Sequence, residues 1–186
     1  GVPAALLSVF VAELVRSRTF RRRYMPERFS PAGVLVSMNN ILNERHIDGY
    51  YCTLCYAYFD LKRRLLTLAN SGMPYPLRST PERCEPIELP GFPLGAFSGV
   101  SYDQLVLELT PGDIFVFCTD GVYETFNASD EEFGVERVAE IVQTRRDAPA
   151  SVIVRAIIDA VEGFRGERPQ ADDLTAVVVK IEERPA

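Results

Sequence analysis

The stretch YYCTLCYAYFDLKRRLLTLANSG, residues 50–72, decides the fold class of this chain. Its first half is rich in aromatic and small residues that favour strands, and its second half has the apolar pattern of a returning strand. Residues 60–63, Asp-Leu-Lys-Arg, separate the halves and indicate a turn. The sequence therefore predicts an antiparallel hairpin at this point of the chain.

Further strands and helices are predicted on both sides of the hairpin. Strand patterns occupy 74–89 (two short strands), 104–110, 114–121 and 174–182. Helical patterns occupy 6–15, 30–45, 130–143 and 149–164. Ser30 followed by Pro31 is typical of a helix start. Because the strands come in a run without intervening helices, the order predicts an α+β domain of antiparallel sheets covered by helices.

The composition indicates a soluble globular protein, with 47% hydrophobic and 25% charged residues. A length of 186 residues suits one domain spanning 1–186. The net charge of -6 disfavours nucleic-acid binding, which needs a cationic surface. No apolar run reaches the roughly 18–20 residues that span a bilayer, so no membrane association is expected. Four scattered cysteines are too few for a disulfide framework and indicate a reducing, cytoplasmic setting.

The cysteines do not predict a metal site. Cys52 and Cys55 resemble half a zinc site, but positions three apart on a strand face opposite ways. Cys84 and Cys118 are isolated, and structural zinc requires four converging ligands. Buried, unreactive thiols are therefore expected.

Two acidic sites stand out, the pair Asp120-Gly121 at the end of one strand and the pair Asp172-Asp173 before another. A charge at the edge of an apolar core is costly unless it is paired or binds a metal. Together the pairs would supply hard oxygen ligands suited to Mg²⁺ or Mn²⁺. Since neighbours on a strand face opposite ways, one of Asp172 and Asp173 would face the site while the other braces it. Taken alone, each pair also fits a common turn or a solvated loop.

Five stretches in one order extend this interpretation: GVPAALLS (1–8), the hairpin with ANSGMPYP (69–76), FPLGAF (92–97), PGDIFVFCTDGVYETFN with EEFG (111–134), and ADDLTAVVV (171–179). Over essentially its whole length the chain resembles the SpoIIE-like branch of the metal-dependent PPM protein serine/threonine phosphatases. The resemblance implies a four-layer α-β-β-α sandwich of two antiparallel sheets flanked by helices.

The resemblance also implies a site with two Mn²⁺ or Mg²⁺ ions. Asp120 falls on the aspartate that bridges the metals, and Gly121 and Asp172 fall on further ligand positions. Asp173 would support the ligands, and Glu124 either supports them or is a solvated turn residue. The implied reaction is hydrolysis of phosphoserine or phosphothreonine by a metal-activated water, so no side chain acts as the nucleophile.

The usual substrate in this branch is a phosphorylated anti-anti-sigma protein of the STAS type, which is freed by dephosphorylation to bind an anti-sigma factor. The resemblance therefore implies a partner-switching regulator. It also implies sensor domains in the parent chain and a possible homodimer.

Two departures from the family pattern favour an alternative. The chain starts at the last glycine of the usual Asp-x-Ser-Gly-His-Gly motif or just after it, so an N-terminally truncated domain with a half-built metal site is expected. Met73 stands where the family usually has histidine. A catalytically degenerate regulatory or dimerisation module with the same fold is the alternative function.

Overall fold

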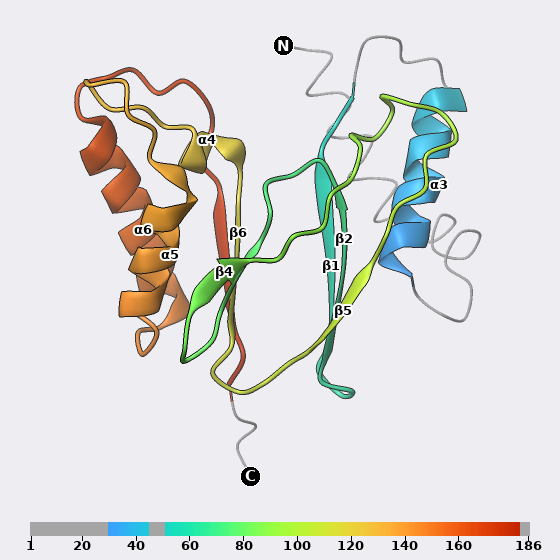
Figure 1. The fold of residues 1–186 in the computed structure, drawn as a ribbon, viewed down its shortest axis with the longest axis horizontal. Coiled ribbons are helices and arrows are strands. Elements are labelled where there is room, and N and C mark those ends of the chain that lie inside the picture. The colour runs from blue at the N-terminus through green and yellow to red at the C-terminus, as the bar shows by residue number, and fades with distance from the viewer. Residues whose placement is uncertain (1–29, 45–50, 183–186) are drawn as a thin grey trace. The chain divides into compact units, whose positions relative to one another are not determined.

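The computed structural model describes residues 30–44 and 51–182. The chain divides into two compact units. The first unit includes the chain up to Met73 and the segment Leu89–Glu108, and the second includes Pro74–Glu88 and the chain from Leu109 onward. The helix predicted at 6–15 lies outside the described residues. Figure 1 shows the elements of both units.

The predicted hairpin forms the sheet of the first unit. β1 (Leu54–Asp60) pairs with β2 (Leu65–Ser71) in antiparallel register along its whole length. The side chain of Asp60 closes the turn, because its Oδ1 accepts the N–H groups of Lys62 and Arg63 at 3.1 and 3.0 Å. β5 (Leu105–Glu108) pairs with the other edge of β2, which gives the order β1-β2-β5.

Helix α3 (Pro31–Glu44) covers one face of this sheet (Figure 1). It begins as predicted, because Ser30 Oγ accepts the N–H of Gly33 at 3.1 Å and caps the first turn. Its apolar face packs on the hairpin and on the loop that precedes β5, which contributes Leu94 and Tyr102. The buried residues of this core are Val34, Leu35, Met38, Leu42, Ala69, Leu94 and Tyr102.

The second unit contains an antiparallel sheet of four strands in the order β4-β3-β6-β7. The strands are β3 (Leu77–Ser79), β4 (Cys84–Pro86), β6 (Ile114–Cys118) and β7 (Ala176–Lys180). β6 lies between β3 and β7 and is buried almost throughout, as its apolar run predicts. The pairing of β6 with β7 brings the segments around 119 and 175 together, which positions the candidate site.

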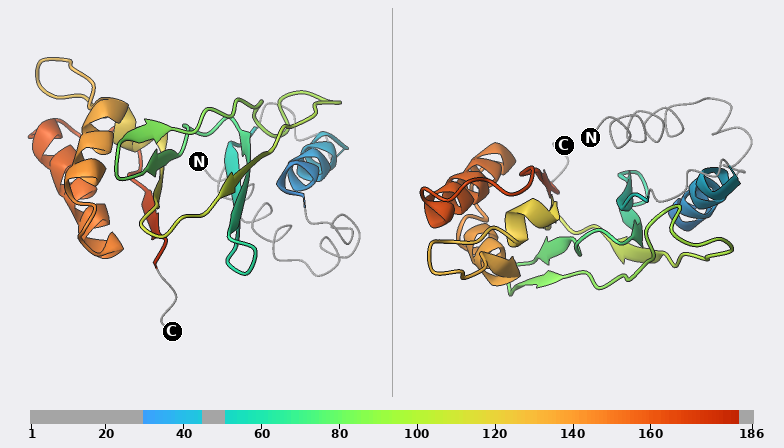
Figure 2. Two further views of the ribbon diagram at one scale, coloured as in Figure 1. Left: turned by 60° about the horizontal axis from the view of Figure 1, so that its bottom comes forward. Right: turned by 90° about the horizontal axis from the view of Figure 1, so that it is seen from above.

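Helices α5 (Gly134–Thr144) and α6 (Ala150–Arg165) lie side by side against the second sheet, as both views of Figure 2 show. α6 packs mainly on β7, and α5 packs on β3 and β4. Their apolar faces and one face of β6 form a single core. The buried residues that α5 and α6 contribute are Val138, Val142, Ile153, Ile157 and Val161. The two antiparallel sheets with their helices confirm the predicted α+β class.

The predicted start of a helix at residue 130 was wrong, since α5 begins at Gly134. Asp130 has a φ of 60°, a left-handed conformation that a helix does not tolerate. The side chain of Asn127 stabilises the loop, because its Oδ1 accepts the N–H groups of Ser129 and Glu131. These local hydrogen bonds use backbone groups that a helix would need, so α5 begins only after this loop.

Within the described residues, no helix is both long and apolar enough to cross a bilayer.

Candidate metal and substrate site

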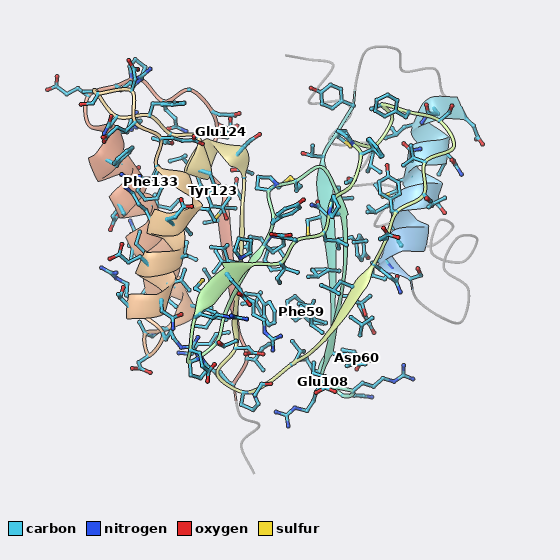
Figure 3. All side chains as sticks on the ribbon, in the orientation of Figure 1. Phe59, Asp60, Glu108, Tyr123, Glu124 and Phe133 are labelled. Atoms are coloured by element: carbon cyan, nitrogen blue, oxygen red, sulfur yellow. The ribbon has the colours of Figure 1, made fainter. Side chains whose placement is uncertain are left out.

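Asp120 begins a short helix, α4 (Asp120–Tyr123), directly after β6. Its carboxylate is exposed, and its Oδ1 accepts the N–H of Gly121 at 2.9 Å. Asp120 thus lies at the edge of the core, between buried Cys118 and buried Gly121, but solvent reaches its carboxylate, so hydration also stabilises this charge. Tyr123 instead provides the buried face of α4, while Glu124 follows at its exposed end (Figure 3).

Thr119 joins the two acidic sites, although no sequence pattern singles it out. Its Oγ1 donates to the carbonyl oxygen of Asp173 at 3.1 Å, across 54 residues of sequence. The N–H of Thr175 donates to the same Oγ1, and the N–H of Thr119 donates to the carbonyl oxygen of Thr175. These bonds extend the β6–β7 pairing and hold the Asp172-Asp173 segment beside Asp120-Gly121.

Gly121 lets the two segments approach closely. A Cβ atom at this position would lie 2.5 Å from the carbonyl oxygen of Asp173, closer than real contacts allow. The carbonyl oxygen of Gly121 accepts the hydroxyl of buried Thr125 at 2.6 Å. The glycine predicted as a metal ligand is thus also required for packing.

Substitution of Gly121 by alanine should destabilise the protein. The new methyl group has to push the backbone at Asp173 away, and overpacking of this kind costs about 1–3 kcal/mol. Gly163→Ala is the matched control, because it lies in α6 with open space around its Cβ position and should stabilise by about 0.5–1 kcal/mol. Urea unfolding followed by circular dichroism would test both, and equal stability of Gly121→Ala and wild type would contradict the packing argument.

The donors at this edge fit part of a site for a hard cation. Asp120 and Asp172 are exposed carboxylates, and Asp172 is oriented by the N–H of Asp173, which its Oδ1 accepts at 2.7 Å. Carboxylate and carbonyl oxygens are the ligands that Mg²⁺ and Mn²⁺ prefer. No group of three or more His, Cys, Asp or Glu side chains in the described part of the chain is arranged to hold a metal. These residues therefore provide only part of a complete ligand set.

A pocket of about 260 Å³ opens at the same edge. Gly121 and Asp172 line it, together with Glu124, Phe126, Arg165 and Arg168. Asp172 thus faces the pocket, whereas Asp173 contributes its backbone carbonyl to Thr119. The expected division between one aspartate that faces the site and one that braces it stays a prediction, because both residues precede β7, which begins at Ala176.

Cys118 and Tyr123, the two buried titratable side chains on either side of Asp120, are neutral at ordinary pH. Burial raises the pKa of the Cys118 thiol to about 11 and also raises the pKa of the Tyr123 hydroxyl.

Cys52 and Cys55 in the first unit are free and half-buried, and burial raises the pKa of both thiols, that of Cys55 to about 11. A thiol with a raised pKa is a poor nucleophile, as expected for the cysteines of this chain.

Met73 follows a turn in the first unit that depends on Asn70. The buried Asn70 amide donates to the carbonyl oxygens of Met73 and Leu89 at 2.9 and 3.0 Å, and its Oδ1 accepts the N–H of Met73. The sulfur of Met73 accepts the hydroxyl of Thr53 at 3.2 Å. The turn is thus built without the histidine expected at position 73.

Comparison with known sequences identifies a family. Residues 1–182 match the family model described as Stage II sporulation protein E (SpoIIE). The chain is similar to the phosphoserine phosphatase RsbU of Bacillus subtilis (strain 168), with 23% identity over 185 residues that cover 97% of this chain and 52% of RsbU. The chain thus spans about half the length of the curated relative that it matches.

Solved structures share the fold. The SiaA-PP2C domain of Pseudomonas aeruginosa superposes with a TM-score of 0.82 at 21% identity, over 98% of this chain and 71% of that chain. The RsbU and RsbW domains of Rv1364c from Mycobacterium tuberculosis give a TM-score of 0.79 at 19% identity, over 100% of this chain and 50% of that chain. These likenesses confirm the predicted PPM-like fold of two antiparallel sheets with helices.

Proposed function

The chain belongs to the SpoIIE family of protein phosphatases, and from this premise we propose that it hydrolyses phosphoserine or phosphothreonine on a regulatory protein. The observation that supports the proposal is the approach of two acidic sites, Asp120-Gly121 and Asp172-Asp173, at the edge of one pocket. Asp172 and Gly121 line that pocket, and Asp120 directly precedes Gly121. The curated relative is named a phosphoserine phosphatase, which agrees with this reaction.

Divalent metal is part of the proposal. The carboxylates of Asp120 and Asp172 and the carbonyl oxygen of Gly121 would hold Mn²⁺ or Mg²⁺. Such ions, when bound, supply Lewis acidity and an acidified water. The chain itself orients these donors, because Thr119 binds the Asp173 carbonyl and Thr125 binds the Gly121 carbonyl. Asp173 and Glu124 support the ligands in this proposal, the former through its backbone.

A phosphorylated anti-anti-sigma protein of the STAS type is the proposed substrate. One structural neighbour contains RsbU and RsbW domains in the same protein, and the curated relative is an RsbU. We therefore propose a partner-switching role, in the cytoplasm, with sensor domains in the parent chain and the possibility of a homodimer.

A non-catalytic regulatory module is the second candidate. The described residues supply too few ligands for a complete metal cluster, and Met73 stands where the family usually has histidine. A degenerate module would keep the fold and the packing of Gly121 but would neither bind Mn²⁺ at Asp120 nor turn over phosphate esters.

The test is hydrolysis of an aryl phosphate and of a phosphoserine peptide, with added Mn²⁺ and after removal of metal by a chelator. The phosphatase should require the metal in both reactions, and calorimetry should detect Mn²⁺ binding that weakens in Asp172→Asn. Absence of turnover together with absence of Mn²⁺ binding would favour the regulatory module instead.

A further inference from the structure

The pocket beside the candidate metal site has an arginine side as well as an acidic side. Arg165 ends α6, and Arg168 lies in the loop that follows. Arg168 is already paired, because its Nη1 donates to Asp130 Oδ1 at 2.6 Å and to the carbonyl oxygen of Asn127 at 2.8 Å. Its guanidinium also lies 5.6 Å from the ring centre of Phe126. Arg168 therefore forms a fixed wall of the pocket.

Arg165 is held in place but is not neutralised. Its Nη1 donates to the carbonyl oxygen of Arg168 at 2.9 Å, which fixes the guanidinium. Its Nε is buried and has no hydrogen-bond partner, and Arg165 forms no ion pair within the described residues. A guanidinium has five N–H donors in a planar fork, and because Nε is buried, the remaining N–H groups of Nη1 and Nη2 are those left for a ligand. The pocket thus offers an oriented cation that forms no ion pair within the described residues, although Asp172 and Glu124 also line the pocket.

The chemistry of the pocket points to a carboxylate as the partner of Arg165. The phosphoryl group of a substrate belongs at the edge formed by Asp120 and Asp172, where the metal is proposed. Arg165 would then meet a second anionic group of the same substrate. Arginine binds carboxylates bidentately with two parallel N–H···O bonds, and the pocket volume of about 260 Å³ suits a side chain.

We infer that Arg165 selects phosphoprotein substrates that carry an aspartate or glutamate close in sequence to the phosphorylated residue. This inference rests on the proposed function, because it assigns the specificity of the same site. Arg165 is a specificity-determining residue in this scheme, and Arg168 with Phe126 shapes the pocket around it. Glu124 also lines the pocket, and its exposed carboxylate repels an acidic side chain of the substrate. The substrate's aspartate or glutamate is therefore accepted only where it contacts Arg165.

The experiment measures binding separately from turnover. Three fluorescent peptides carry a non-cleavable phosphonate analogue of phosphoserine, flanked on both sides by Asp, Ala or Lys, and are titrated against the chain by fluorescence anisotropy with Mn²⁺ present. Wild type should bind the Asp peptide about tenfold tighter than the Ala peptide, as expected for a charge-assisted hydrogen-bonded pair. Arg165→Gln should bind both equally. Arg155→Gln, an exposed arginine on the same helix, is the matched control and should behave as wild type.

A charge-reversed variant distinguishes the loss of one contact from misfolding. Arg165→Glu should prefer the Lys peptide, and loss of structure cannot produce a new preference. Equal or undetectable binding of all three peptides by wild type would overturn the inference, as would a retained Asp preference in Arg165→Glu. Equal weakening of all three peptides by Arg165→Gln would also overturn it, because Arg165 would then contact the phosphoryl group. Asp120→Asn turnover reports separately on the proposed reaction, so the two ideas can fail independently.

Discussion

Asp120→Asn should lower metal-dependent kcat/KM for an aryl phosphate by at least about 100-fold, because the variant removes a proposed carboxylate ligand and with it several kcal/mol of metal-derived stabilisation. Stability should change little. The carboxylate of Asp120 is exposed, and an asparagine oxygen can still accept the N–H of Gly121. Substitutions at such surface positions usually stay within about 0.5 kcal/mol. Kinetics with Mn²⁺ and thermal unfolding together would separate the two effects.

Asp159→Asn is the control for this variant. Asp159 is an exposed aspartate on α6 that does not line the pocket, so both its activity and its melting temperature should match wild type. Activity of Asp120→Asn within twofold of wild type would remove Asp120 from the proposed site. An equal loss in both aspartate variants would indicate a general charge effect instead.

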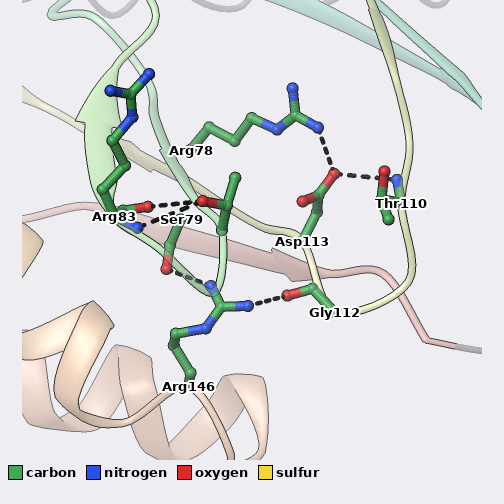
Figure 4. Close-up of polar contacts among 8 residues, drawn as sticks. Arg78, Ser79, Arg83, Thr110, Gly112, Asp113 and Arg146 are labelled. Carbon is green, nitrogen blue, oxygen red and sulfur yellow. Dashed lines mark hydrogen bonds and ion pairs between the residues drawn. The ribbon is translucent and has the colours of Figure 1, made fainter.

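Asp113→Ala should produce the largest loss of stability. Asp113 is 3% exposed and accepts a hydrogen bond from Arg78 Nη2 at 2.7 Å and from the N–H of Thr110 at 3.0 Å (Figure 4). Breaking a buried ion pair costs about 3–5 kcal/mol, because the remaining charge loses that ion pair in a partly desolvated environment. Since Arg78 is 25% exposed, water can partly hydrate it, and about 3 kcal/mol is expected. Urea unfolding would measure this change.

Glu85→Ala is the matched comparison on the same sheet. Its carboxylate pairs with Arg83 at 3.0 Å, but the two side chains are 50% and 71% exposed. Exposed pairs contribute about 0–1 kcal/mol, so this variant should remain close to wild type. Similar losses for Glu85→Ala and Asp113→Ala would show that burial does not determine the strength of these pairs.

The secondary-structure elements that depend on neighbouring residues could be predicted from the sequence. The hairpin follows from strand-forming residues on both sides of Asp60, which closes the turn with its own side chain. The start of α3 follows from Ser30 and Pro31, since capping involves only neighbouring groups. The same local patterns were sufficient to identify the family. Local reasoning failed at residue 130, where the side chain of Asn127 competes with the helix.

The side chains that meet at the candidate site could be identified only from the tertiary structure, because they come from segments far apart in the sequence. The exposure of Asp120 depends on a short helix after β6, and sequence periodicity cannot detect so brief an element. Thr119 contacts Asp173 because β6 and β7 pair, which is a long-range event. Arg165 reaches the same pocket as Gly121 because α6 packs on β7, which pairs with β6. Acidic motifs can thus be recognised in the sequence, whereas their burial, their neighbours and the opposing arginine depend on how distant segments pack.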